Sequence, residues 1–168
     1  MPKLPDTIEN AVQLRGNDKA GMALKMLRRL LKKQPDDAVL NYQTAWTCDT
    51  LGLEREAVPY YEQALVLGLD GEDLRGALLG LGSTYRALGE YDKAVATCEA
   101  GLEFFPDGRE FQVFLALALY NLGKPDQAMT LLLRNLAETS NDAGIVRYRQ
   151  AILFYSDKLD ETWGREGR

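Results

Sequence analysis

The sequence predicts an all-α fold, an α-solenoid built from antiparallel helix pairs. The pattern Leu-Gly-x-x-x-x-Ala occurs three times, beginning at Leu51, Leu88 and Leu122, and a weaker upstream copy retains Ala23. From Ala23 to Ala57 the step is 34 residues, from Ala57 to Ala94 it is 37, and from Ala94 to Ala128 it is 34. A period of this length is typical of stacked two-helix units. No segment carries a convincing strand pattern.

Each unit is expected to divide into two helices at its glycine. Before Gly89, apolar residues follow one another at three- and four-residue intervals from Leu74 to Leu88, which places them on one helix face. Gly89 can adopt the left-handed conformation that ends a helix. Ala94 then supplies a small side chain where the second helix packs closely against the first.

The period also predicts the boundaries of the units. We expect four units at about 4–37, 38–74, 75–108 and 109–141, a terminal helix at 142–160 and a flexible tail at 161–168. The 37-residue step predicts a longer loop at 68–73. In the first unit Asp18 replaces the turn glycine, and the first helix (about 8–14) is short, as in a capping unit. Pro59 falls inside a predicted helix and predicts a mild kink there.

The composition favours a folded protein that binds neither membranes nor nucleic acid. Hydrophobic residues make up 46% of the chain and charged residues 27%. No apolar stretch approaches a membrane span and the start lacks a secretion-signal pattern, so we expect a cytoplasmic protein. Residues 1–34 hold eight Lys or Arg and three acids, a charge of +5, which leaves −10 on the remainder of a chain whose net charge is −5. This acidic total disfavours binding nucleic acid along the whole surface.

The residue types argue against an enzyme, a metal site or a bound cofactor. The chain has no histidine, the commonest general base and metal ligand. Its two cysteines, Cys48 and Cys98, are expected to be reduced core residues. The stretch Gly80-Leu81-Gly82-Ser83 faintly suggests a dinucleotide loop, but it lies within a helical pattern and follows no strand. We therefore expect no catalytic residues, no metal and no cofactor.

The repeat resembles the tetratricopeptide repeat. The third unit carries the clearest copy, the run 81–94 with Leu102 and Pro106, and residues 52–65 and 123–128 resemble further copies. The resemblance implies about four units in a right-handed superhelix, whose first helices line a concave groove that holds peptide ligands. We expect the last helix to cap this stack.

The exposed face of the first helices gives the candidate groove residues. A hydrophobic or amphipathic helix, or a peptide of a partner protein, suits their apolar and aromatic character. Members of the family that grip a C-terminal carboxylate have Lys, Asn and Arg at positions held here by Ile8, Val12, Gln43, Gly76 and Gly80, so that mode is not expected. Whether Tyr42 and Trp46 line the groove or pack in the core stays open at this stage. The candidates are Val39, Tyr42, Gln43, Trp46, Asp49, Leu79, Ser83, Arg86, Val113, Leu117, Tyr120 and Asn121.

Self-association is the alternative function. The terminal helix has one regular apolar stripe, which suits a cap and also suits a two-chain seam. A homodimer could also form head to tail, between the basic first unit and the acidic remainder of another copy. The stripe consists of Ile145, Tyr148, Ile152, Tyr155 and Leu159.

Overall fold

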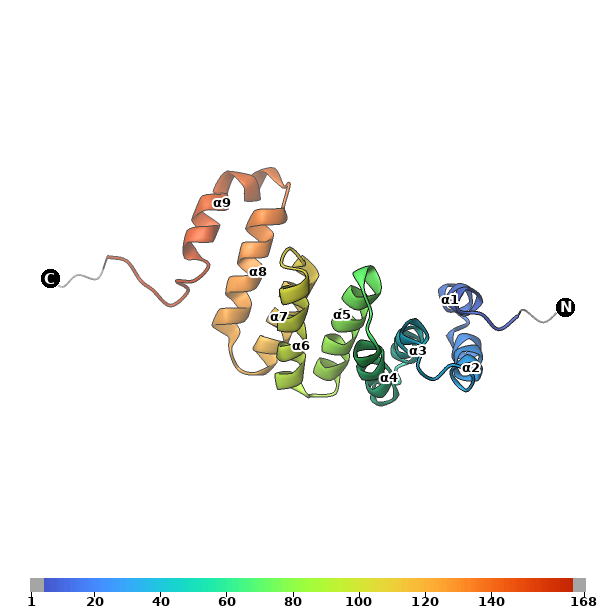
Figure 1. Cartoon of the computed structure of the whole chain (residues 1–168). Helices are drawn as coiled ribbons and strands as arrows, with labels where there is room; N and C mark the ends of the chain where they lie inside the picture. The colour runs from blue at the N-terminus through green and yellow to red at the C-terminus, as the bar shows by residue number, and fades with distance from the viewer. Residues whose placement is uncertain (1–4, 165–168) are drawn as a thin grey trace.

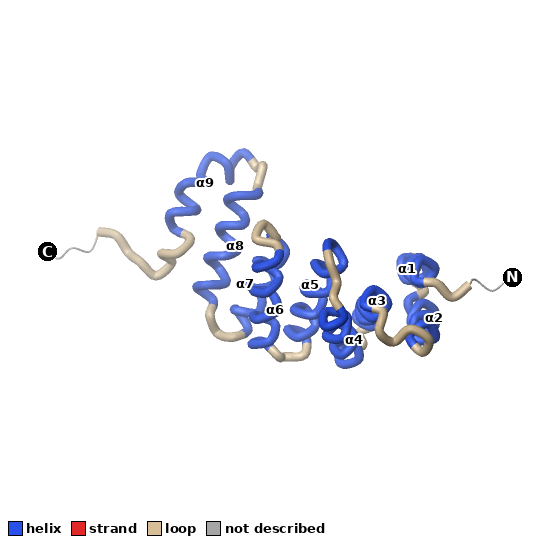
Figure 2. Tube along the Cα trace, viewed as in Figure 1, coloured by secondary structure: helices blue, strands red, loops and turns tan. Residues whose placement is uncertain are grey.

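The computed structural model describes residues 5–164, and these contain nine α-helices and no strands. The helices lie side by side along the molecule, with α1 and α9 at opposite ends (Figure 1). Loops between them are short (Figure 2). The helices are α1 (Ile8–Gly16), α2 (Ala20–Leu31), α3 (Ala38–Thr50), α4 (Glu54–Leu67), α5 (Gly71–Ala87), α6 (Tyr91–Phe104), α7 (Arg109–Asn121), α8 (Pro125–Thr139) and α9 (Ala143–Tyr155).

The turn inside each helix pair uses a residue with a left-handed backbone. Gly52, Gly89 and Gly123 have φ values of 69°, 82° and 74°, where a side chain would be strained. Asp18 holds the equivalent place after α1 with φ 57°, and it is the only residue other than glycine with a positive φ in the part of the chain described. The turn after α1 therefore has the same geometry as the others, at a higher conformational cost.

The 37-residue step comes from a longer helix. The expected loop at 68–73 is wrong in its second half, because α5 begins at Gly71 and runs for 17 residues, against 13 for α3. Asp70 has the extended backbone of an N-cap, and Glu72 and Asp73 lie in the first turn. Acidic groups stabilise a helix there by interacting with its dipole, so the residues that suggested a loop begin a helix instead.

The alanines of the repeat lie where each pair closes. Ala23, Ala57 and Ala94 are 0% exposed and Ala128 is 4% exposed. They belong to three apolar clusters along the stack, so each pair contributes to a core that continues into the next. This confirms the architectural role expected for the repeated alanine.

The first helices of the pairs form an inner layer. Helix α3 packs against both α1 and α5, and α5 packs against α7. In contrast, the backbones of α2 and α4, of α4 and α6, and of α6 and α8 do not come close to each other within residues 5–164. Side chains still bridge the first of these gaps, since Arg28 on α2 pairs with Glu56 on α4. The outer helices therefore spread apart while the inner helices stay close. This geometry places α3, α5 and α7 on the inner side of the stack.

The terminal helix α9 packs only on α8. It does not reach α7 in the described structure, and none of its residues is buried. Polar interactions connect the two helices, since Arg149 Nε donates to the Ala137 carbonyl (2.7 Å) and Thr130 Oγ1 donates to the Ser156 carbonyl (2.8 Å). The α9 helix thus covers one side of α8 without extending the inner layer.

Residues 161–164 of the expected tail are not helical, and 165–168 lie outside the described residues. None of the helices within 5–164 has the length and apolar character that a bilayer crossing requires.

Candidate functional site

A groove of about 520 Å³ opens on the inner layer. Its residues come from the three inner helices, with one contribution from α4. It combines aromatic and aliphatic side chains with a single carboxylate. The lining residues are Tyr42, Trp46, Asp49, Thr50, Tyr61, Gly76, Leu79, Gly80, Ser83 and Phe114.

Trp46 is the most prominent apolar residue of the groove. It is 45% exposed, and its ring stacks on Tyr42 with 5.9 Å between centroids. The Arg15 guanidinium lies over the same ring, 4.0 Å from its centroid. A cation at this distance over an indole is attracted by the ring electrons. Trp46 is therefore held in place from two sides while much of its surface faces solvent.

The position of Arg15 is fixed by α3. Its guanidinium donates to the Gln43 side-chain oxygen (2.8 Å), the Gln43 carbonyl (3.2 Å) and Thr47 Oγ1 (3.0 Å). Burial lowers the pKa of Arg15 despite these partners. Gln43 is only 7% exposed, so the structure places it beneath the surface as a support for Arg15. The first helix pair thus contributes to the groove indirectly, through Arg15.

The floor of the groove is made by two tyrosines that cross over glycines. Tyr42 is 6% exposed and Tyr61 is 1% exposed. A Cβ atom at Gly76 would lie 2.0 Å from Tyr42 Oη, and one at Gly80 would lie 2.4 Å from Tyr61 Oη. These glycines are required for close approach, since α5 is helical through both positions.

Asp49 connects three helices beneath the groove. Its carboxylate accepts hydrogen bonds from Tyr61 Oη (2.8 Å) on α4 and from Thr84 Oγ1 (2.9 Å) on α5. Burial raises the pKa of Asp49, and the two hydroxyl donors oppose that shift because they stabilise the charged form. Asp49 therefore lines the groove and also ties α3 to its neighbours.

Arg86 provides a cation without an acidic partner at the α5–α7 side. Its Nη1 lies 3.4 Å from Asn121 Oδ1, a weak interaction, and its buried Nε atom has no hydrogen-bond partner. Within residues 5–164 no carboxylate forms an ion pair with it. A buried N–H without a partner is costly.

The exposed apolar surface continues along α7 beyond the groove. Val113 is 36% exposed, Leu117 is 38% exposed and Tyr120 is 67% exposed. Side chains three or four residues apart on a helix share one face, so these three extend the apolar surface toward the carboxyl end of α7.

The structure brings together part of the candidate set. Tyr42, Trp46, Asp49, Leu79 and Ser83 line the groove, whereas Val39, Gln43, Arg86, Val113, Leu117, Tyr120 and Asn121 do not. Sequence reasoning missed five lining residues. Of these, Thr50 and Phe114 lie one residue from the expected stripes, Gly76 and Gly80 have no side chain to suggest a role, and Tyr61 comes from a second helix.

The stripe expected on the terminal helix divides into two sets. Ile145 and Ile152 are half-buried, whereas Tyr148 (59%), Tyr155 (49%) and Leu159 (48%) are exposed. The exposed set continues into a cluster of aromatic rings in which Tyr155 and Trp163 lie 5.3 Å apart, with Phe154 beside both. The end of the stack therefore exposes an aromatic surface.

The cysteines are buried and free. Burial raises the pKa of both thiols to about 11, so they are protonated at neutral pH and are poor nucleophiles. Among residues 5–164, no group of His, Cys, Asp and Glu side chains is arranged to hold a metal ion.

Comparison with known proteins identifies the family. The model described as Tetratrico peptide repeat matches residues 38–159 of the chain. The chain belongs to the tetratricopeptide repeat family. Proteins of this family and of this fold serve as interaction scaffolds for other proteins, which is the functional class that the comparisons support. No sequence among the curated proteins matches the chain.

Solved structures of tetratricopeptide repeat proteins share the fold. MamA is 14% identical with a TM-score of 0.68, over 88% of this chain and 92% of that one. MamA from Desulfovibrio magneticus RS-1 is 17% identical with a TM-score of 0.64, over 92% and 96%. YrrB, described as having an unusual peptide-binding site, is 18% identical with a TM-score of 0.69, over 92% and 77%. At these identities the similarity establishes the helical repeat solenoid alone.

Proposed function

We propose that this tetratricopeptide repeat protein binds a peptide or an amphipathic helix of a partner protein in the groove between α3, α5 and α7. The observation that carries the proposal is Trp46, which is held by Arg15 and Tyr42 and yet is 45% exposed. Exposing a large ring to water is unfavourable, and aromatic anchors contribute most of the binding energy of protein interfaces. That YrrB is described as having a peptide-binding site agrees with the proposal.

The arrangement of charge suggests how the ligand is oriented. The apolar part of the groove is lined by Trp46 on α3, Leu79 on α5 and Phe114 on α7. Arg86 lies beyond it, without an acidic partner in the described residues. A ligand that places apolar residues in the groove and an acidic residue or a carbonyl next to Arg86 would match both the apolar lining and the cation.

Replacement of Trp46 tests the proposal directly. Proteins from a lysate of the source cell are captured on the wild type, on Trp46→Ala and on Val66→Ala, and the retained proteins are identified. Val66 is 82% exposed on the outer helix α4, so its variant also removes an exposed apolar side chain. We expect the wild type and Val66→Ala to retain a common partner that Trp46→Ala loses. With the purified partner, Trp46→Ala should bind about thirtyfold more weakly than the wild type, because an anchor residue contributes about 2 kcal/mol to binding.

Two further measurements identify the cause of any loss. Circular dichroism and thermal melting of Trp46→Ala should match the wild type, and a collapse of helicity would mean that Trp46 is a core residue. In a Trp163→Phe background, Trp46 is the only tryptophan. Its emission should then shift to the blue when the partner binds, since the ring leaves water. Retention of every partner by Trp46→Ala would remove the groove as the binding site.

Self-association through the terminal helix is a second candidate function. The exposed set Tyr148, Tyr155 and Leu159, with Phe154 and Trp163, favours it, since monomers rarely expose such contiguous apolar surface. We expect the mass measured by light scattering to rise with concentration, and Tyr148→Lys with Tyr155→Lys to prevent this rise. In the head-to-tail alternative, the basic first unit meets the acidic remainder and the assembly dissociates with salt. A monomer at every concentration and ionic strength would dismiss both.

A further inference from the structure

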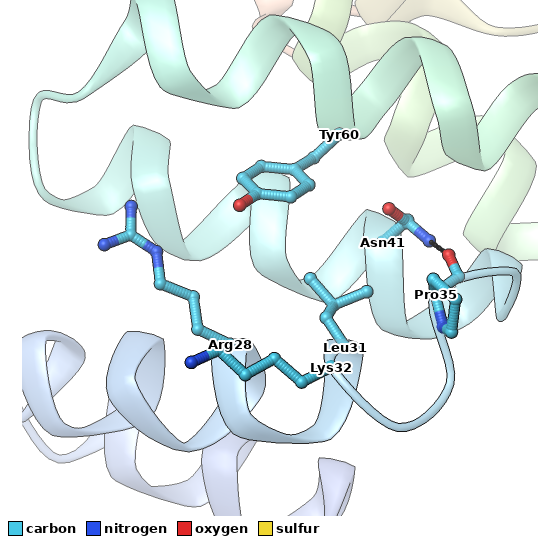
Figure 3. Close-up of a pocket in the computed structure, with 6 residues that line it drawn as sticks. All are labelled: Arg28, Leu31, Lys32, Pro35, Asn41 and Tyr60. Carbon is cyan, nitrogen blue, oxygen red and sulfur yellow. Dashed lines mark hydrogen bonds between the residues drawn. The ribbon is translucent and has the colours of Figure 1, made fainter.

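A second pocket lies on the outer side of the stack, between α2 and α4. The backbones of these two helices spread apart, with Arg28 and Glu56 forming an ion pair across the gap, and a pocket of about 370 Å³ lies between them, next to the start of α3. Figure 3 shows its residues on three helices and the turn after α2. We call it the outer pocket. Its lining residues are Arg28, Leu31, Lys32, Pro35, Asn41 and Tyr60.

The outer pocket has two cations at one side. The side chain of Arg28 is 43% exposed and pairs with Glu56. Lys32, one helical turn further along the chain, is exposed and forms no ion pair within residues 5–164. The Tyr60 hydroxyl points toward this side of the pocket (Figure 3). This side can therefore hold a carboxylate, with Lys32 as its free partner.

The opposite side of the outer pocket holds a fixed hydrogen-bond acceptor. Asn41 is 3% exposed, and its Nδ2 donates to the carbonyls of Pro35 and Asp37, both at 2.8 Å. These two bonds determine the orientation of the amide, so its Oδ1 faces the pocket on the side of Tyr60 (Figure 3). Among the described residues no donor reaches that oxygen. Asn41 Oδ1 is therefore free to accept a hydrogen bond from a ligand or from water.

The charge of the surrounding surface favours an acidic ligand. Helix α2 and the turn after it carry Lys25, Arg28, Arg29, Lys32 and Lys33. Arg28 pairs with Glu56 and Arg29 with Asp6, so the three lysines are the cations that form no ion pair within residues 5–164. Residues 1–34 carry +5 in total while the whole chain carries −5. The first helix pair therefore brings an excess of positive charge to the outer pocket, where Leu31 and Pro35 provide an apolar wall.

We propose that the outer pocket binds an extended acidic segment of a partner protein. A carboxylate of the segment pairs with Lys32 and Arg28, a main-chain N–H donates to Asn41 Oδ1, and an apolar side chain packs on Leu31 and Pro35. The segment is extended, because the N–H groups inside a helix are already used by the helix itself. A phosphate group, unlike a peptide unit, has no N–H to donate to Asn41 Oδ1. This site is separate from the groove and does not depend on it.

Fluorescence anisotropy with defined peptides tests the proposal on the full chain. The probe is fluorescein-Gly-Ser-Glu-Leu-Glu-Ser-Gly-amide, and the matched peptide carries Gln in place of both Glu. We expect the Glu peptide to bind at least tenfold more tightly than the Gln peptide. Lys32→Glu should weaken binding of the Glu peptide at least tenfold, whereas Lys33→Glu, the same charge change one residue away and outside the pocket, should change it less than twofold. Nitrogen-15 spectra should show a shift of the Asn41 side-chain amide, and Trp46→Ala should bind the peptide normally.

Several results would overturn the proposal. Equal losses in Lys32→Glu and Lys33→Glu would mean general charge attraction without a site. Failure of the Glu peptide to bind at millimolar protein, or equal binding of the Gln peptide, would exclude the acidic segment. Tighter binding of a short single-stranded oligonucleotide would assign the pocket to phosphate. A dimer at low salt that the peptide dissociates would make a second copy of this chain the occupant.

Discussion

Replacing Gly76 by alanine tests the packing that forms the floor of the groove. The new Cβ would lie 2.0 Å from Tyr42 Oη and 2.9 Å from its Cζ. The ring cannot easily move aside, because it is 6% exposed and lies against both Trp46 and Tyr61. Overpacking of a filled core costs about 1–3 kcal/mol. Alanine in place of glycine in a helix recovers about 0.5–1 kcal/mol, so we expect a net loss of stability of about 1 kcal/mol.

A double-mutant cycle with Tyr42→Phe isolates this interaction. Phenylalanine removes Oη, which has no hydrogen-bond partner in the described structure, and leaves Cζ as the nearest atom at 2.9 Å. In that background Gly76→Ala should cost less than in the wild type, because the 2.0 Å contact is gone and only a small shift of the ring is needed to relieve the one at 2.9 Å. The four proteins are compared by urea unfolding followed by circular dichroism. Additivity within about 0.5 kcal/mol, or stabilisation of the wild type by Gly76→Ala, would refute the reasoning.

Two further predictions concern conformation and pH. Asp18→Gly should raise the free energy of unfolding, measured in urea, by about 0.5–1 kcal/mol. The reason is that Asp18 has φ 57°, a conformation that glycine adopts at no steric cost. The control is Asn17→Gly at the neighbouring position, where φ is −103° and we expect no gain in stability. Burial raises the pKa of Asp49 in the folded protein above its usual 3.8. Protonation of Asp49 therefore stabilises the folded state: this stabilisation is fully present below about pH 3.8 and is lost as the pH rises through the folded-state pKa. The wild type should therefore lose stability relative to Asp49→Asn as the pH rises from about 4 to 7, measured by urea unfolding at each pH.

The elements of the fold could be predicted because their causes are local. The glycine at 52, 89 or 123 ends a helix by its own backbone conformation, and the alanine after it allows two adjacent helices to meet. The start of α5 was less accessible, since Asp70 to Asp73 suit both a loop and an acidic helix start. Which of these two conformations forms is decided by packing against neighbouring helices, and the local sequence does not contain that information.

The candidate groove could be predicted in part, because side-chain periodicity gives a helix face but not its depth. Trp46 and Tyr42 lie on the same predicted stripe, yet one is exposed and the other is buried. The difference arises across helices, where Gly76 on α5 leaves space for the Tyr42 ring and Arg15 on α1 covers one face of Trp46. No spacing within a single repeat encodes interactions of this kind. The burial of Gln43 has the same kind of cause, since its partner Arg15 lies 28 residues earlier in the chain.

The isolation of α9 has a consequence for how the molecule opens. The other end of the stack has its own apolar cluster, in which Ala11 and Leu27 are fully buried and Leu40 joins α3 to the first pair. In contrast, α9 contributes no buried residue and touches only α8. In a linear array each unit is stabilised only by its neighbours, so the end with the smallest interface separates first. Amide hydrogen exchange should therefore be fastest in α9, and unfolding should progress from the carboxyl end toward the groove. The groove lies far enough inside the array to keep its shape after that end has frayed.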